Sequence, residues 1–157
     1  MTPARLLRPA SGPVLALLVG LGACAPSISL YDATAYENAT DLKAEAVLLM
    51  AEATDPPADH ADAIAALRLG ARQALEYERG RPANEITTRM WSILLDPEAA
   101  LLESFLRRWE AEGPLRPAFV TEAVVQVAEA FDQIIGLESG KLSPEDVDVS
   151  LFPGLSL

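Results

Sequence analysis

The sequence predicts an all-α protein, a compact antiparallel bundle of four to five helices formed by residues 31–140. Apolar residues recur at the three- and four-residue spacing of amphipathic helices, and no segment shows the sustained alternation of a β-strand. Alanine, a strong helix former, occurs 27 times among the 157 residues. The segments between the helical stretches are short, which favours antiparallel packing of consecutive helices.

The first helix is expected over residues 32–53. Its second half, residues 46–51, reads Ala-Val-Leu-Leu-Met-Ala and is apolar on every side of a helix. Such a segment is usually buried, so we expect burial on several sides here. Pro56 and Pro57 end this helix, because proline cannot continue a helix and disfavours the helical conformation in the residue before it.

The second helix is expected over residues 58–79 and the third over residues 85–95. Gly80 and Pro82 follow the second helix in the order that commonly ends one. Asn84 precedes the third helix, and its side chain is expected to cap the free backbone N–H groups there.

The fourth helix is expected to begin at Asp96-Pro97-Glu98, because an acidic N-cap followed by proline is typical of a helix start. Gly113 ends it. The fifth helix, residues 117–138, has the most regular apolar stripe of the chain. The stripe consists of Phe119, Ala123, Val124, Val127, Phe131, Ile134 and Ile135.

Residues 141–157 form a C-terminal tail that ends in apolar residues. We expect the tail to fold back over the bundle. The alternative is a free segment whose Leu151 and Phe152 enter a groove on a partner.

The composition fits one domain and excludes several classes of function. The formal net charge of −11 opposes nucleic-acid binding, because affinity for phosphates comes from clustered lysine and arginine. The single cysteine allows no internal disulfide and no cysteine zinc site, and the single histidine excludes sites that need two. No cofactor is indicated.

The first 23 residues have the organisation of a secretory signal peptide. They contain Arg5 and Arg8 but no acid, and residues 14–21 form an apolar run. This run is too short to cross a bilayer as a mature helix, which needs about 20 apolar residues.

The run ends in Leu21-Gly22-Ala23-Cys24, which resembles the lipobox of bacterial lipoproteins. Small residues before the cysteine let the signal peptidase approach the backbone, and the thiol is the nucleophile that receives the diacylglyceryl group. The alternative is an ordinary secretory signal with a chance cysteine, but the only cysteine of the chain falls where a lipobox needs it.

The resemblance implies a signal peptide of residues 1–23 and a lipidated tether of residues 24–30. Two or more acyl chains on Cys24 would anchor the protein stably to a membrane. Ala25 follows the cysteine, whereas aspartate there would resemble an inner-membrane retention signal. The expected location is therefore the periplasmic face of the outer membrane, with another envelope protein as partner.

His60, Asp59 and Asp62 form a possible metal site. On a helix, however, His60 would point about 100° away from Asp59. The alternative is a solvated first turn, in which acids interact favourably with the helix dipole.

Arg107, Arg108 and Arg116 form the one basic cluster of the chain and could contact an anion or an acidic partner. Alternatively, Arg107 and Arg108 pair with neighbouring acids. The acids in question are Glu103, Glu110, Glu112 and Glu122.

Two further features are open to both structural and functional interpretations. Glu78 lies on the apolar stripe of its helix and is expected to be partly buried and paired with an arginine, although Glu78 or Glu85 could also serve as a catalytic acid. Thr87 and Thr88 are poor helix formers, so the helix that contains them either carries function or simply places Trp91 in the core.

These observations favour a non-enzymatic helical interaction or accessory module tethered to a membrane. They contain no set of nucleophile, base and orienting group. A small-molecule or metal-binding lipoprotein is the second hypothesis, and a cell-wall hydrolase is the third.

Overall fold

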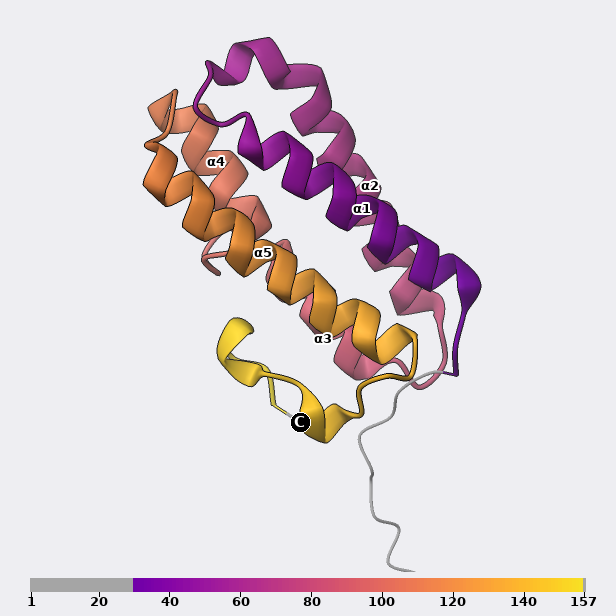
Figure 1. Ribbon diagram of the computed structural model, residues 1–157. Helices are drawn as coiled ribbons and strands as arrows, with labels where there is room; N and C mark the ends of the chain where they lie inside the picture. The colour runs from indigo at the N-terminus through magenta and orange to yellow at the C-terminus, as the bar shows by residue number, and fades with distance from the viewer. Residues whose placement is uncertain (1–29, 157) are drawn as a thin grey trace, which may run out of the picture.

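The computed structural model describes residues 30–156. The signal peptide, the lipobox with Cys24 and most of the tether lie outside the described residues. Five α-helices make up most of the described chain (Figure 1): α1 (Ala33–Ala51), α2 (Ala61–Gly80), α3 (Glu85–Leu94), α4 (Leu102–Glu112) and α5 (Pro117–Glu138). A short 3₁₀ helix, η1 (Pro57–His60), lies between α1 and α2, and two more, η2 (Pro144–Asp146) and η3 (Val149–Leu151), follow α5. Residues 30–156 contain no strand, so the predicted all-α class is confirmed.

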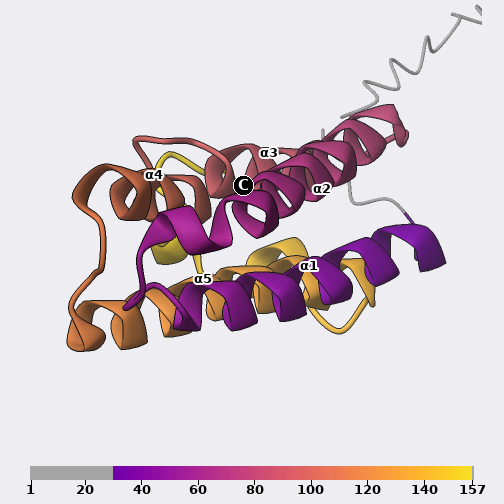
Figure 2. The ribbon, with the colours of Figure 1, turned by 90° about the horizontal axis from the view of Figure 1, so that it is seen from above.

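The helices form an antiparallel four-sided bundle in which α3 and α4 share one side. Helices α1 and α5 make one layer, and α2, α3 and α4 make the other (Figure 2). Helix α1 packs against both α2 and α5, and α3 packs against both α2 and α5. The chain therefore runs up, down, up in two pieces, and down again, as the short connections predicted.

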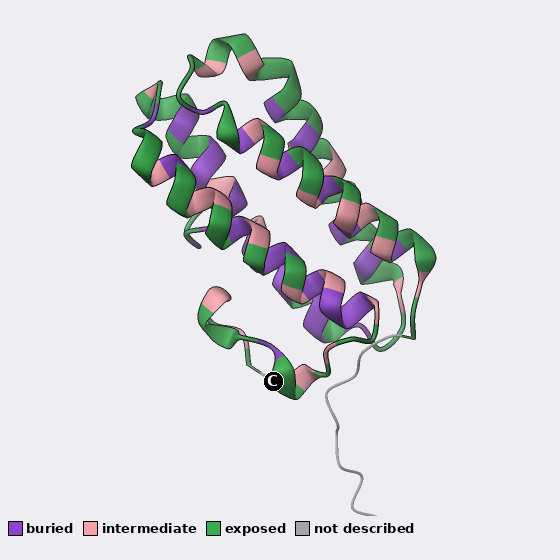
Figure 3. Cartoon of the chain, viewed as in Figure 1, coloured by how far each residue is buried: buried purple, intermediate pink, exposed green. Residues whose placement is uncertain are grey.

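A single hydrophobic core runs through the bundle (Figure 3). Trp91 and Trp109 are fully buried in it, and the ring of Trp91 meets that of Phe131 edge to face at 5.7 Å between centroids. The C-terminal tail folds back, because Val147 and Phe152 are buried in the same core. The expectation of a folded tail is thus confirmed.

The expectation that residues 46–51 are buried on several sides is wrong. Ala46 and Met50 are buried, but Ala51 is exposed and the Leu48 side chain is 70% exposed. Helix α1 lies at a corner of the bundle and packs mainly against α2 and α5, so part of its circumference faces outward. An apolar surface is therefore left open to solvent.

The expected helix start at Asp96-Pro97-Glu98 is also wrong, because α4 begins at Leu102. Asp96 instead forms a turn, in which its Oδ1 accepts from the Glu98 N–H at 2.9 Å. Ala99 and Leu101 are both buried. A helix would point residues two apart in different directions, whereas the irregular segment lets both side chains reach the core.

Helix α2 begins at Ala61 rather than at residue 58. Pro56 is extended, and Pro57 opens the 3₁₀ turn η1 that precedes the α-helix. The third and fifth predicted helices, in contrast, match α3 and α5 to within a residue.

Candidate functional site

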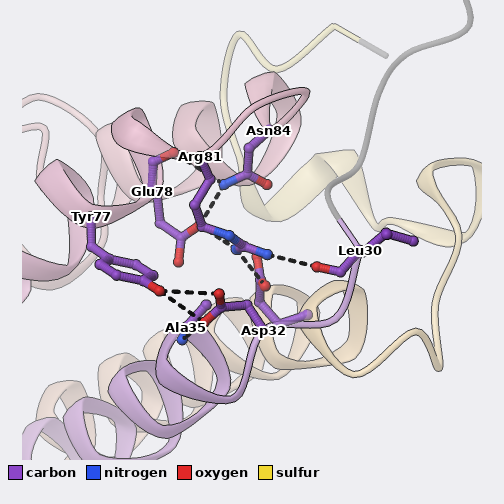
Figure 4. Close-up of polar contacts among 8 residues, drawn as sticks. Leu30, Asp32, Ala35, Tyr77, Glu78, Arg81 and Asn84 are labelled. Carbon is purple, nitrogen blue, oxygen red and sulfur yellow. Dashed lines mark hydrogen bonds and ion pairs between the residues drawn. The ribbon is translucent and has the colours of Figure 1, made fainter.

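A buried ionic cluster lies where the C-terminal ends of α2 and α5 meet the entry of the chain into α1 (Figure 4). It consists of Glu78 from α2, Glu138 from α5, and Arg81 and Asn84 from the loop between α2 and α3. The Glu78 side chain is 1% exposed and that of Arg81 is 8% exposed. Glu78 is paired with an arginine, as expected, and it is buried more completely than the partial burial that was expected.

Arg81 holds this cluster together. Its Nη1 donates to Glu78 Oε2 at 2.7 Å and to Glu138 Oε2 at 2.6 Å. Its Nη2 donates to the Leu30 carbonyl oxygen at 2.9 Å. One guanidinium thus joins the ends of two helices to the residue at which the described chain begins.

The prediction that the Asn84 side chain caps α3 is wrong. Its Nδ2 donates to the Glu78 carboxylate and, at 3.3 Å, to the Glu78 carbonyl oxygen. A cap would use the Asn84 Oδ1 to accept from the free backbone N–H groups of α3. Instead, the amide points inward, where its Nδ2 donates to the charged Glu78 carboxylate, a strong acceptor. Helix α3 consequently begins without a side-chain cap.

Two carboxylates share one positive group in this cluster. Burial raises the pKa of Glu138, and the nearby Glu78 raises it further, while Arg81 and, more weakly, the Thr87 hydroxyl act in the opposite direction. The two carboxylates in turn raise the pKa of Arg81 against the effect of its own burial. The Oε1 atoms of Glu78 and Glu138 are buried and have no hydrogen-bond partner among residues 30–156.

This geometry bears on the hypothesis of a catalytic glutamate. Glu78 is closed off from solvent and engaged by Arg81 and Asn84. Neither Glu78 nor Glu85 lines any of four surface grooves found on residues 30–156. A substrate has no direct route to the Glu78 carboxylate in this conformation.

The candidate metal ligands do not converge. The His60 ring lies 5.3 Å from the Trp109 ring between centroids, and its Nε2 is 4.0 Å from Asp55 Oδ2. Asp59 and Asp62 are exposed. Within residues 30–156, no group of three or more histidine, cysteine, aspartate or glutamate side chains could hold a metal ion.

The candidate basic cluster is spread over the surface around α4. Arg108 donates to Glu112 at 3.1 Å and lies 4.4 Å above the centre of the Phe119 ring. Arg107 and Arg116 are exposed. Arg108 also lines a small groove of about 200 Å³ beside Phe105 and Phe119.

Arg68 forms ion pairs with Glu103 and Glu110, two of the acids that the sequence suggests as partners of Arg107 and Arg108. It donates to Glu103 at 3.0 Å and to both carboxylate oxygens of Glu110 at 2.8 Å. Sequence reasoning missed this arginine because it lies on α2, far along the chain from α4. The pairing links α2 to α4 within one layer of the bundle.

An open groove lies between α1 and α2, hereafter the α1/α2 groove. It consists of two adjoining hollows of about 410 and 520 Å³, which share Glu45 and Ala66. Exposed apolar side chains border it: Leu48, Leu69 and Tyr77. Sequence reasoning missed the groove, although the apolar run of residues 46–51 was a signal of it.

No protein family, curated protein or solved structure shows significant similarity to this chain. None of the helices in residues 30–156 combines the length and the apolarity needed to span a membrane.

Proposed function

We propose that this chain is a lipoprotein anchored through Cys24 to the periplasmic face of the outer membrane, where it acts as a non-enzymatic interaction module. The proposed anchor rests on the N-terminal signal pattern and on the lipobox-like sequence at residues 21–24. The proposed interaction rests on the bundle and its surface.

The observation that carries the interaction role is the exposed apolar border of the α1/α2 groove. Leu48 is 70% exposed and Leu69 is 59% exposed. Single exposed leucines are ordinary, but here two leucines and a tyrosine border one groove, and exposed apolar side chains gathered in this way typically mark a binding site. The ionic cluster supports this role indirectly, because it fixes the tether end of the domain to the bundle through Leu30.

The anchor is tested by growing cells that express the full chain with radiolabelled palmitate. The wild-type chain and the matched tether variant Ser27→Ala should both carry the label in the membrane fraction, and Cys24→Ser should carry none. A labelled Cys24→Ser chain, or an unlabelled wild type, would contradict the anchor.

The interaction role is tested in the same cells with a photo-cross-linking residue placed at Leu69. The control position is Glu129, which is exposed on α5 and outside the groove. We expect one dominant envelope protein to be captured from Leu69 and not from Glu129. Equal capture from both positions, or none from Leu69, would reject the interaction role while leaving the anchor standing.

A further inference from the structure

We infer that the α1/α2 groove binds a basic amphipathic α-helix of a partner protein. This inference rests on the proposed interaction role and names the chemistry of the partner. It follows from three properties of the groove: its apolar surface, its length and its charge.

The apolar surface fits the face of a helix rather than a small ligand. The groove has a floor that includes the buried residues Leu42, Leu67 and Ala74, and its borders carry the exposed Leu48, Leu69 and Tyr77. At Gly70 the two helices come so close that an added Cβ would lie 3.0 Å from a Leu42 methyl group. The groove is therefore a shallow, open trough, which suits the apolar stripe of an amphipathic helix.

The length of the groove corresponds to several helical turns. Its lining residues on α1 run from Asn38 to Glu52. At 1.5 Å per residue this is about 21 Å, or about four turns of a partner helix lying alongside. A peptide of that length would cover both hollows.

The negative charge of the groove favours a partner with positive charge. Asp41, Glu45 and Glu52 line it, and none of its lining residues is basic. No ion pair is found for these three carboxylates within residues 30–156. A helix with lysine or arginine beside its apolar stripe would complement them, and such complementarity governs both partner choice and association rate.

The same charge disfavours two other occupants. A second copy of the chain, placed groove to groove, would set these three acids against their equivalents. An anionic membrane surface would likewise repel them. Both occupants are distinguishable outcomes of the test below.

The probe is a labelled helical peptide of about 18 residues, with leucine and alanine on one face and lysine on the other. The matched probe carries glutamate in place of each lysine. Binding is measured by fluorescence anisotropy to the full chain in phosphatidylcholine nanodiscs, with empty nanodiscs as background. We expect the wild type to bind the lysine peptide and not the glutamate peptide.

The decisive comparison uses two triple variants with the same net charge. One triple variant reverses the charge of the groove: Asp41→Lys, Glu45→Lys and Glu52→Lys. Glu98→Lys, Glu129→Lys and Glu145→Lys make the same change in charge at exposed positions outside it. We expect the groove variant to lose at least about tenfold in affinity for the lysine peptide and to gain affinity for the glutamate peptide. The control should change by less than about threefold, because exposed charges at a distance are screened by salt.

A further variant, Leu48→Ser with Leu69→Ser, tests the apolar contribution without touching a charge. It should lower the affinity for the lysine peptide several-fold. Equal losses in both triple variants would overturn the inference, because net charge rather than the groove would then be responsible. A wild-type dimer that is lost in Leu48→Ser/Leu69→Ser, or wild-type binding to phosphatidylglycerol vesicles through these leucines, would overturn it in favour of a second copy or a membrane.

This outcome is separable from that of the proposed function. If Leu69 captures a protein in cells but the contacting segment is not a basic helix, the partner chemistry fails and the interaction role stands. If Leu69 captures nothing while the lysine peptide still binds, the interaction role in the cell fails instead.

Discussion

The ionic cluster and the α1/α2 groove invert the usual distribution of polar and apolar residues. The cluster buries two carboxylates and a guanidinium, while the groove exposes leucines to solvent. The charged groups of the cluster pair with one another within the chain, and these pairs join the ends of α2 and α5. The leucines of the groove, in contrast, are left exposed by residues 30–156. Exposed apolar side chains of this kind favour contact with a partner outside the chain.

Replacing Arg81 with methionine tests the structural role of the cluster most severely. The change leaves two buried carboxylates without a counter-charge, and we expect the free energy of unfolding to fall by about 3–5 kcal/mol near neutral pH. Urea denaturation followed by circular dichroism measures this. The control, Arg79→Met, removes an exposed partner of Glu76 and should cost no more than about 1 kcal/mol. Similar losses in both variants would show that the cluster adds nothing beyond a surface pair.

The pH dependence of stability tests the raised pKa of Glu138. The pKa of this carboxyl in the folded protein lies above its usual 4.5, so the folded state binds the proton more tightly than the unfolded state does. The group therefore contributes stability below about pH 4.5, and the contribution is lost as pH rises through the raised pKa. The difference in unfolding free energy between wild type and Glu138→Gln should accordingly fall from pH 4 to pH 7.

The matched control for this measurement is Glu145→Gln, at an exposed position. The difference in unfolding free energy between wild type and Glu145→Gln should stay constant from pH 4 to pH 7. A flat difference for Glu138→Gln would mean that burial does not disfavour its charge.

The smallest stability change is expected at the groove. Leu48→Ser with Leu69→Ser should alter the free energy of unfolding by less than about 1 kcal/mol, because both side chains are mostly exposed. Leu106→Ala, in the core, should cost about 2–5 kcal/mol by the same denaturation measurement. A large loss in the groove variant would identify its leucines as part of the core and remove the contrast with the cluster.

Local sequence patterns predicted the parts of the fold that depend on local interactions. The bounds of α3 and α5 follow from apolar periodicity and from flanking proline or glycine, and the burial of Glu78 follows from its place on a stripe. The start of α4 did not follow, because the burial of Ala99 and Leu101 in the tertiary structure overrides a good local start signal.

The two sites were less predictable because both depend on helices that are distant in sequence. Glu138 joins Arg81 from 57 residues away, and no spacing rule brings α5 to that loop. The exposure of Leu48 likewise depends on which sides of α1 the other helices leave uncovered. A helix that is apolar all round indicates that some surface must be covered, but the arrangement of the bundle decides which part remains open.

The hydrogen bond from Arg81 to the Leu30 carbonyl has a geometric consequence for an anchored protein. It attaches the tether to the end of the bundle that carries Tyr77, which donates to Asp32 at 3.0 Å and also lines the α1/α2 groove. Six residues from Cys24 to Leu30 can span at most about 20 Å. Under the proposed anchoring, Leu30 would stay within that distance of the lipid headgroups, and the Tyr77 end of the groove is the end nearer to it. A partner helix would then have to present itself close to the membrane surface, which favours juxtamembrane segments over domains deep in the periplasm.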